Sequence, residues 1–281
     1  MFNKKVILIS GFSRGGTNII WNILQSHPEI CSAMYETHNL INDKENKIRR
    51  KISIFRKLSL TDSAILKSLV DYELYRLKMS NYVHESNKFI FSDIKYSRKQ
   101  MKETALCLKS VDKAIELTDF LLGVYPGLYF ISIVRNGYAV LEGHLRRGSS
   151  VQETGLLYQF IADKMKYYSE VVPNYKLFKF EEVLDDVFAC SQRLFEFTDS
   201  QPVHLDSLRL KSKRILKSDG EHEVKYGQEK KKYWYDRNNI DNYFNKSIND
   251  IQIKNLQSKE IKEFNKYAKS ALEYFSYDIL H

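Results

Sequence analysis

A short glycine-rich turn near the amino terminus holds the residues with the clearest chemical potential. The apolar run Val6-Ile-Leu-Ile leads into Gly11, and Gly16 precedes a segment with helical character that begins at Thr17. We call residues 11–16 the glycine loop. Glycines allow a tight turn, successive N–H groups then face inward, and the positive end of the following helix adds to the field. Arg14 adds a permanent charge in a planar fork suited to oxyanions. The pattern predicts a site for a phosphate-like group.

The two residues after this loop separate it from the nucleoside-triphosphatase pattern. The spacing from Gly11 to Gly16 fits G-x-x-x-x-G, but Thr17 and Asn18 stand where those enzymes carry Lys and Ser/Thr. The lysine and the hydroxyl that holds magnesium are both missing. We therefore predict anion binding without an obligatory metal; the alternative is a plain strand-to-helix turn with a solvated arginine.

Two further cations follow apolar strands. Arg135 comes directly after the run 128–134, which predicts a buried parallel strand, and open α/β sheets bind ligands at the carboxyl ends of such strands. Lys109 lies near the end of a second apolar run, 105–110. The alternatives are a strand-end salt bridge for Arg135 and a solvated side chain for Lys109, which lies in a stretch rich in Lys and Arg.

The elements that must position these residues follow from periodicity and from helix breakers. Apolar spacing, together with the breakers Gly123, Pro126 and Pro173, predicts helices over 17–26, 111–122, 137–147, 152–171 and 258–275. Residues 43–83 contain neither glycine nor proline and predict a helical insertion. Glu181 and Glu182 are interpreted as structural residues at a helix start.

The chain resembles sulfotransferases that use 3′-phosphoadenosine 5′-phosphosulfate as donor. Ser13-Arg14-Gly15-Gly16-Thr17-Asn18 is similar to their 5′-phosphosulfate loop, P-R-S-G-T-T/N, and His27-Pro28-Glu29-Ile30 is similar to their H-P-x-[IV] segment. Tyr35-Glu36-Thr37 resembles the E-E-T segment of the tyrosylprotein-type branch. The resemblance implies an α/β fold: a P-loop-type open, mostly parallel sheet flanked by helices. It implies donor contacts from Ser13, Arg14, Gly15, Gly16, Thr17 and Asn18.

The family's 3′-phosphate site is matched in part. Arg135-Asn136-Gly137 fits its start, but the serine expected eight residues after the arginine is Gly143. The hydroxyl contact is then absent, replaced by water, or supplied by a neighbour such as His144, Arg146 or Arg147. By resemblance, Arg135 and Gly143 complete the donor site. The basic residues Lys230, Lys231 and Lys232 precede a tryptophan as in the family; they contact the 3′-phosphate or are solvated.

The resemblance also implies catalytic roles. Lys109 and Arg14 stabilise charge on the transferring group, and Glu36 takes the proton from the acceptor hydroxyl. Placing Glu36 at the base position needs an insertion of about two residues after His27-Pro28, so His38 is a second candidate.

Composition fits a single α/β domain spanning residues 1–281, with the helical insertion at about 43–83 and a helical carboxyl-terminal extension at about 236–281. The net charge of +9 favours anionic partners, although no nucleic acid is expected. Cys31, Cys107 and Cys190 are odd in number and lack C-x-x-C spacing, so we predict neither a metal cluster nor a disulfide framework. Oligomeric state leaves no signal in the sequence.

Lys4 and Lys5 are the only charged residues before the first strand, and no segment is apolar enough to span a membrane. We expect a cytoplasmic protein, or a soluble catalytic domain lacking its anchor. The expected function is transfer of a sulfuryl group from 3′-phosphoadenosine 5′-phosphosulfate to the hydroxyl of a carbohydrate, tyrosine, lipid or small molecule. The alternatives are a P-loop kinase-like phosphoryl transferase and a non-catalytic nucleotide- or polyanion-binding protein.

Overall fold

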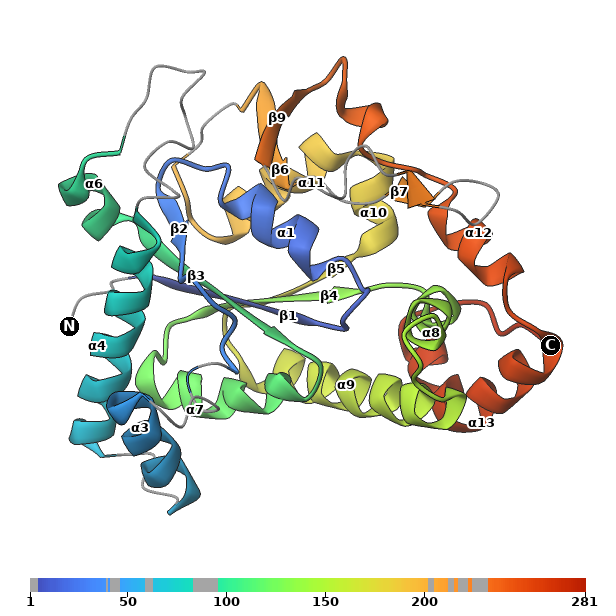
Figure 1. Ribbon diagram of the computed structural model, residues 1–281, viewed down its shortest axis with the longest axis horizontal. Coiled ribbons are helices and arrows are strands. Elements are labelled where there is room, and N and C mark those ends of the chain that lie inside the picture. The colour runs from blue at the N-terminus through green and yellow to red at the C-terminus, as the bar shows by residue number, and fades with distance from the viewer. Residues whose placement is uncertain are drawn as a thin grey trace.

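A parallel sheet forms the centre of the molecule, as predicted. The computed structural model describes residues 5–38, 40, 46–58, 63–82, 96–201, 205–211, 215–216, 222–223 and 232–281. Within these residues, five strands pair in parallel in the order β2-β3-β1-β4-β5 (Figure 1). They are β1 (Val6–Gly11), β2 (Ile30–Ser32), β3 (Ala105–Val111), β4 (Tyr129–Val134) and β5 (Tyr175–Lys179). The order places β1, β3 and β4 side by side at the centre.

Helices flank this sheet. Their bounds are α1 (Thr17–Leu24), α3 (Lys47–Lys57), α4 (Ala64–Ser80), α6 (Arg98–Glu103), α7 (Leu117–Val124), α8 (Gly137–Leu145), α9 (Val151–Val171), α10 (Phe180–Asp185), α11 (Val187–Phe197), α12 (Ile248–Lys254) and α13 (Ser258–Tyr274). Figure 1 shows α1, α10 and α11 on one face of the sheet and α7, α9 and α13 on the other. Both faces are therefore covered, as a parallel sheet requires.

Successive residues of the central strands contribute to two separate cores. In β1, Val6 and Leu8 join the core that contains α4, α7, α9 and α13, whereas Ile7 and Ile9 join the core that contains α1, α10 and α11. This follows from the two-residue period of a strand, in which neighbouring side chains point to opposite faces. The same rule places Lys109 of β3 on the face covered by α1, because Ala105 and Cys107 belong to that core.

Several helix ends follow local signals. A capping box of Ser150 and Glu153 starts α9, which ends two residues before Pro173.

The predicted helix over 111–122 is wrong in its first part. A 3₁₀ helix, Asp112–Glu116, comes first, and α7 follows it. Asp112 has a φ of 53°, in the left-handed region, which prevents an α-helix from starting there.

The predicted insertion around 43–83 contains α3 and α4 within its described residues. The carboxyl-terminal segment begins with β9 (Lys232–Asp236), which pairs antiparallel with β6 (Ser207–Lys211), while β7 (Ile215–Leu216) pairs with β8 (His222–Glu223). A 3₁₀ helix, Ile240–Asn242, then leads to α12 and α13. None of the helices in the described residues is long and apolar enough to cross a membrane.

Candidate functional site

The glycine loop joins β1 to α1 at the carboxyl edge of the sheet. Gly11 is a site of close approach, since a Cβ there would lie 2.5 Å from the carbonyl oxygen of Ile133 in β4. Gly16 has a φ of 97°, which favours glycine, and a Cβ there would lie 2.5 Å from the ring of Phe180. These two glycines permit the tight turn, because a side chain at Gly11 would clash with β4 and one at Gly16 would clash with Phe180 of α10.

The loop leaves the start of α1 open to an anion. Gly16 occupies the N-cap position, no side chain of the described residues caps this end, and its first turn carries no acidic residue. Helix N-termini present unpaired N–H groups together with the positive end of the dipole. The backbone N–H groups at Thr17 and Asn18 are therefore suited to hold phosphate or sulfate oxygens.

Arg14 has an exposed side chain at the tip of the loop, and its backbone is held in an unusual conformation. Its φ of 67° lies in the left-handed region, which is unfavourable for a residue other than glycine. The carbonyl oxygen of Arg14 accepts a hydrogen bond from Nη1 of Arg135 at 2.9 Å, and the neighbouring N–H of Ser13 donates to Asp112 at 2.8 Å. These two contacts hold the loop from both sides. The contact with Asp112 left no signal in the sequence.

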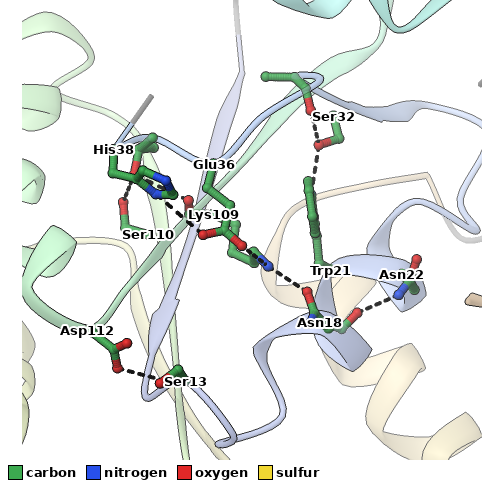
Figure 2. A network of polar contacts seen from close by, with 12 residues as sticks. Ser13, Asn18, Trp21, Asn22, Ser32, Glu36, His38, Lys109, Ser110 and Asp112 are labelled. Atoms are coloured by element: carbon green, nitrogen blue, oxygen red, sulfur yellow. Dashed lines mark hydrogen bonds and ion pairs between the residues drawn. The ribbon is translucent and has the colours of Figure 1, made fainter. Parts of the chain in front are cut away.

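Lys109 lies at the centre of a polar cluster on the α1 face of the sheet. Its Nζ is 2.6 Å from Oε1 of Glu36 and donates to Oδ1 of Asn18 at 2.5 Å, and it lies 4.4 Å from the centre of the Trp21 ring. Its side chain is only 2% exposed. The other carboxylate oxygen of Glu36 is 3.4 Å from Nδ1 of His38. Figure 2 shows Lys109 between Glu36 and Asn18, with His38 beyond the carboxylate.

The segment that carries Glu36 is fixed to β3 next to Lys109. Thr37 donates its backbone N–H to the carbonyl oxygen of Lys109 at 3.0 Å, and its hydroxyl contacts that of Ser110 at 2.5 Å. The structure thus places Glu36 beside the predicted catalytic lysine, and His38, the second base candidate, beside Glu36. A carboxylate that can accept a proton, a desolvated ammonium group and an open helix N-terminus lie next to one another here.

Arg135 directly follows β4, and its guanidinium is buried. Its Nε donates to Asn249 at 2.8 Å, Nη1 to Arg14, and Nη2 to Gln252. The ring of Phe180 lies 4.6 Å from the guanidinium carbon. Burial lowers the pKa of Arg135 to about 10, so the group stays charged at neutral pH. All three nitrogens have protein acceptors, which makes Arg135 a support of the glycine loop in this structure.

Gly143, the position of the expected serine, packs against the side chain of Arg14. A Cβ at Gly143 would lie 3.1 Å from Cγ of Arg14, closer than an ordinary contact. Of the neighbours predicted to replace the serine, His144 forms a 3.0 Å hydrogen bond with the hydroxyl of Ser13, and Arg146 pairs with Glu142 at 2.6 Å. His144 therefore contacts the glycine loop, while Arg147 is exposed.

The other residues that the sequence singled out include Glu181 and the lysines at 230–232. Glu181 has a structural role, as interpreted, because its carboxylate accepts from the backbone N–H of Asn136 at 3.0 Å and from the hydroxyl of Tyr277 at 2.8 Å. Lys230 and Lys231 lie outside the described residues, as does the side chain of Lys232. Within the described residues, no three His, Cys, Asp or Glu side chains gather into a group that could hold a metal ion.

Comparisons with known proteins agree with this architecture. The family model described as the sulfotransferase family matches residues 7–201. The sulfotransferase domain from the curacin biosynthetic pathway is similar in structure at 14% identity, with a TM-score of 0.55 over 99% of this chain and 100% of that domain. The sulfotransferase domain of the olefin synthase from Synechococcus PCC 7002 gives 14% identity and a TM-score of 0.54 over 99% and 96%. At 14% identity, the similarity to these two structures shows a shared fold only. Among curated proteins, none matches the chain in sequence.

Proposed function

The chain belongs to the sulfotransferase family, and from this premise we propose that it transfers a sulfuryl group from 3′-phosphoadenosine 5′-phosphosulfate to the hydroxyl oxygen of an acceptor. The observation that carries the proposal is the meeting of Lys109, Glu36 and Asn18 at the open N-terminus of α1. The transfer requires a binding site for an anion and a base for the acceptor proton, and these residues at one edge of the sheet are suited to supply both.

The glycine loop and the first turn of α1 hold the 5′-phosphosulfate in this proposal. The N–H groups at Thr17 and Asn18 and the exposed guanidinium of Arg14 are the donors. The tight approach at Gly11 and Gly16 supports this assignment, because it keeps the backbone close enough to β4 for the N–H groups to stay directed at the anion. No metal takes part in these contacts.

Lys109 stabilises the charge that develops during transfer. A buried ammonium group acts through a medium of low dielectric, where a charge interaction is stronger than in water. Its partners Glu36 and Asn18 hold the side chain at the start of α1. We propose that Lys109 donates to the sulfuryl oxygens and to the oxygen that bridges sulfur and phosphorus.

Glu36 is the proposed general base. The acceptor oxygen forms a bond to sulfur as its proton passes to the Glu36 carboxylate. The bond between sulfur and the bridging oxygen breaks, and its electron pair leaves with adenosine 3′,5′-bisphosphate. His38 is the second candidate for the base, and its contact with Glu36 also suits it to receive the proton afterwards.

The 3′-phosphate is assigned to the region of Arg135, Arg14 and Gly143, which the structure brings together. The described residues use three of the five N–H donors of Arg135. One N–H on Nη1 and one on Nη2 are left to donate to a phosphate oxygen. The Tyr35-Glu36-Thr37 segment keeps peptidyl tyrosine among the acceptors, alongside carbohydrate, lipid and small molecules.

Label transfer tests the proposal directly. The protein is incubated with donor carrying ³⁵S and pooled hydroxyl compounds from the four acceptor classes, and labelled products are separated chromatographically. We expect a labelled product with the wild-type protein and a large loss with Lys109→Met. Transfer of phosphate from ATP with magnesium, in place of sulfuryl transfer, would establish the kinase-like alternative. Binding of adenosine 3′,5′-bisphosphate without transfer to any class would favour the non-catalytic alternative.

A further inference from the structure

A cavity of about 400 Å³ adjoins the segment that carries Glu36. Met34 and Tyr35 form one wall, and residues of α3, α4 and the turn before α3 form the others, among them Asn46, Arg49, Arg76 and Ser80. Tyr35 is the chain neighbour of Glu36, and neighbouring Cα atoms lie about 3.8 Å apart. The cavity and the proposed base therefore share one short segment of backbone.

Two arginines of this cavity share one buried glutamate. Oε1 of Glu73 accepts from Nε of Arg49 at 2.6 Å and from Nη2 of Arg76 at 2.7 Å, and Oε2 accepts from Nε of Arg76 at 2.8 Å. Burial by itself raises the pKa of Glu73, but hydrogen bonds from Arg76 and Arg49 outweigh it and hold this pKa below its usual range. Glu73 is thus ionised at neutral pH, and these three side chains carry two positive charges against one negative charge.

Arg76 has donor capacity directed away from Glu73. It binds the carboxylate side-on, through Nε and Nη2, and a guanidinium has five N–H donors. Among the described residues, none accepts a hydrogen bond from Nη1 of Arg76, and the side chain is 39% exposed. The outer edge of the fork fits the two oxygens of a carboxylate, sulfate or phosphate.

The other walls suit a molecule with an apolar body. Tyr35 and Met34 are 45% and 39% exposed, and the Arg49 guanidinium lies 5.7 Å from the Tyr35 ring centre, which orients the ring against α3. Aromatic and thioether side chains offer contact area without a specific hydrogen-bonding demand. The cavity thus combines an oxyanion contact at Arg76 with a wall formed by Met34 and Tyr35, the two residues that precede Glu36 in the chain.

We infer that this cavity binds an oxyanion on the acceptor, so that the acceptor carries a carboxylate, sulfate or phosphate group in addition to the hydroxyl that is modified. The inference rests on the proposed function, because it treats the cavity as part of the acceptor site. Arg76 makes the contact, and Arg49 and Glu73 position it.

Phenyl phosphate is a suitable probe, with phenol and benzylamine as neutral and cationic controls. Its binding to the full chain is measured by isothermal titration calorimetry, with and without saturating adenosine 3′,5′-bisphosphate. Arg76→Gln removes the proposed contact. Arg50→Gln is the matched control, since Arg50 is an exposed arginine of α3 outside the cavity lining. Ser80→Phe fills the cavity and keeps the side-chain contacts among Arg49, Glu73 and Arg76; it removes only the hydrogen bond from the Ser80 hydroxyl to the backbone carbonyl oxygen of Arg76, at 2.8 Å. This second variant guards against a loss caused by misfolding of Arg76→Gln.

We expect phenyl phosphate to bind whether or not the bisphosphate is present, and at least tenfold more tightly than phenol or benzylamine. Arg76→Gln and Ser80→Phe should each weaken it at least tenfold, and Arg50→Gln by less than twofold. Wild-type affinity for phenyl phosphate in Arg76→Gln would overturn the inference, because the probe would then bind away from Arg76. Loss of phenyl phosphate binding when the bisphosphate is added would also overturn it, because the probe would then bind in the glycine loop. Failure of the wild-type protein to bind the bisphosphate would instead contradict the proposed function.

Discussion

Replacing Glu36 with glutamine tests the proposed base. The amide keeps the shape of the side chain and an oxygen that can accept from Lys109, whose Nζ lies 2.6 Å from the carboxylate, but it cannot take a proton. General base catalysis contributes about 10²–10⁴-fold to a rate. Each factor of ten corresponds to about 1.4 kcal/mol of activation free energy, so Glu36→Gln should raise the barrier by about 3–5 kcal/mol.

The structure separates this loss of rate from effects on folding and donor binding. Lys109 keeps its contacts with Asn18 and with the Trp21 ring in the variant. Losing one charged partner should therefore lower the unfolding free energy by no more than about 1.5–3 kcal/mol, the value of a hydrogen bond to a charged group, because the amide of glutamine still accepts from Lys109. The affinity for adenosine 3′,5′-bisphosphate should change less than about threefold, because Glu36 makes no contact with the glycine loop or Arg14 among the described residues.

Turnover is measured with the acceptor found by label transfer, bisphosphate affinity by calorimetry, and unfolding by urea titration. Glu170→Gln is the matched control, because Glu170 is exposed in α9, on the other face of the sheet. If Glu36→Gln keeps near-full turnover while His38→Ala abolishes it, the base is His38, and the insertion placed before Glu36 in the family comparison is wrong.

Three further predictions follow from buried or closely packed residues. Arg135→Ala should weaken bisphosphate binding by about 1.5–3 kcal/mol in calorimetry, since it removes a charged donor and the support of the Arg14 carbonyl; unchanged affinity would move the 3′-phosphate site elsewhere. Gly143→Ser should change the bisphosphate affinity by less than about tenfold, because the Arg14 side chain, 3.1 Å from the new Cβ, is flexible. Gly143→Leu should abolish bisphosphate binding. Equal affinities in the two variants would mean that the packing of position 143 against Arg14 has no role in binding. Burial lowers the pKa of Lys78 to about 8, and its Nζ donates to the Thr104 carbonyl at 2.6 Å. The burial cost of the charged lysine is present below pH 8 and is relieved as the pH rises, because the folded chain loses this proton before the unfolded chain does. Between pH 8 and 10 the urea-derived unfolding free energy of the wild type should therefore gain up to about 3 kcal/mol relative to Lys78→Met, and a pH-independent difference would contradict this.

The sequence carried strong local signals for much of the fold. The apolar run and the glycine turn predicted β1, the loop and α1. The helix predicted over 152–171 is observed at Val151–Val171, because Pro173 limits its end. The segment from 111 to 116 could not be predicted in this way. There the left-handed backbone of Asp112 is stabilised by a tertiary contact with the Ser13 N–H, which apolar periodicity does not reveal.

The candidate site was predictable only in part, for a similar reason. The family resemblance pointed to Glu36, Lys109 and Asn18, and Lys109 lies within hydrogen-bonding distance of the other two. The partners of Arg135 were not predictable. Asn249 and Gln252 lie more than a hundred residues away in the sequence, and pairing of side-chain amides with an arginine has no periodic signature. The catalytic roles of these residues stay predictions.

Nucleotide binding without metal tests the central claim most directly. The melting temperature of the full chain is measured with adenosine 3′,5′-bisphosphate in the presence of a chelator, and separately with ATP plus magnesium, each over a range of concentrations. A ligand that binds only the folded state stabilises it in proportion to the logarithm of its concentration relative to the dissociation constant. We predict a concentration-dependent rise with the bisphosphate alone and a smaller effect of ATP. A larger, magnesium-dependent rise with ATP, and none with the bisphosphate, would contradict the assignment of the glycine loop to a phosphosulfate donor.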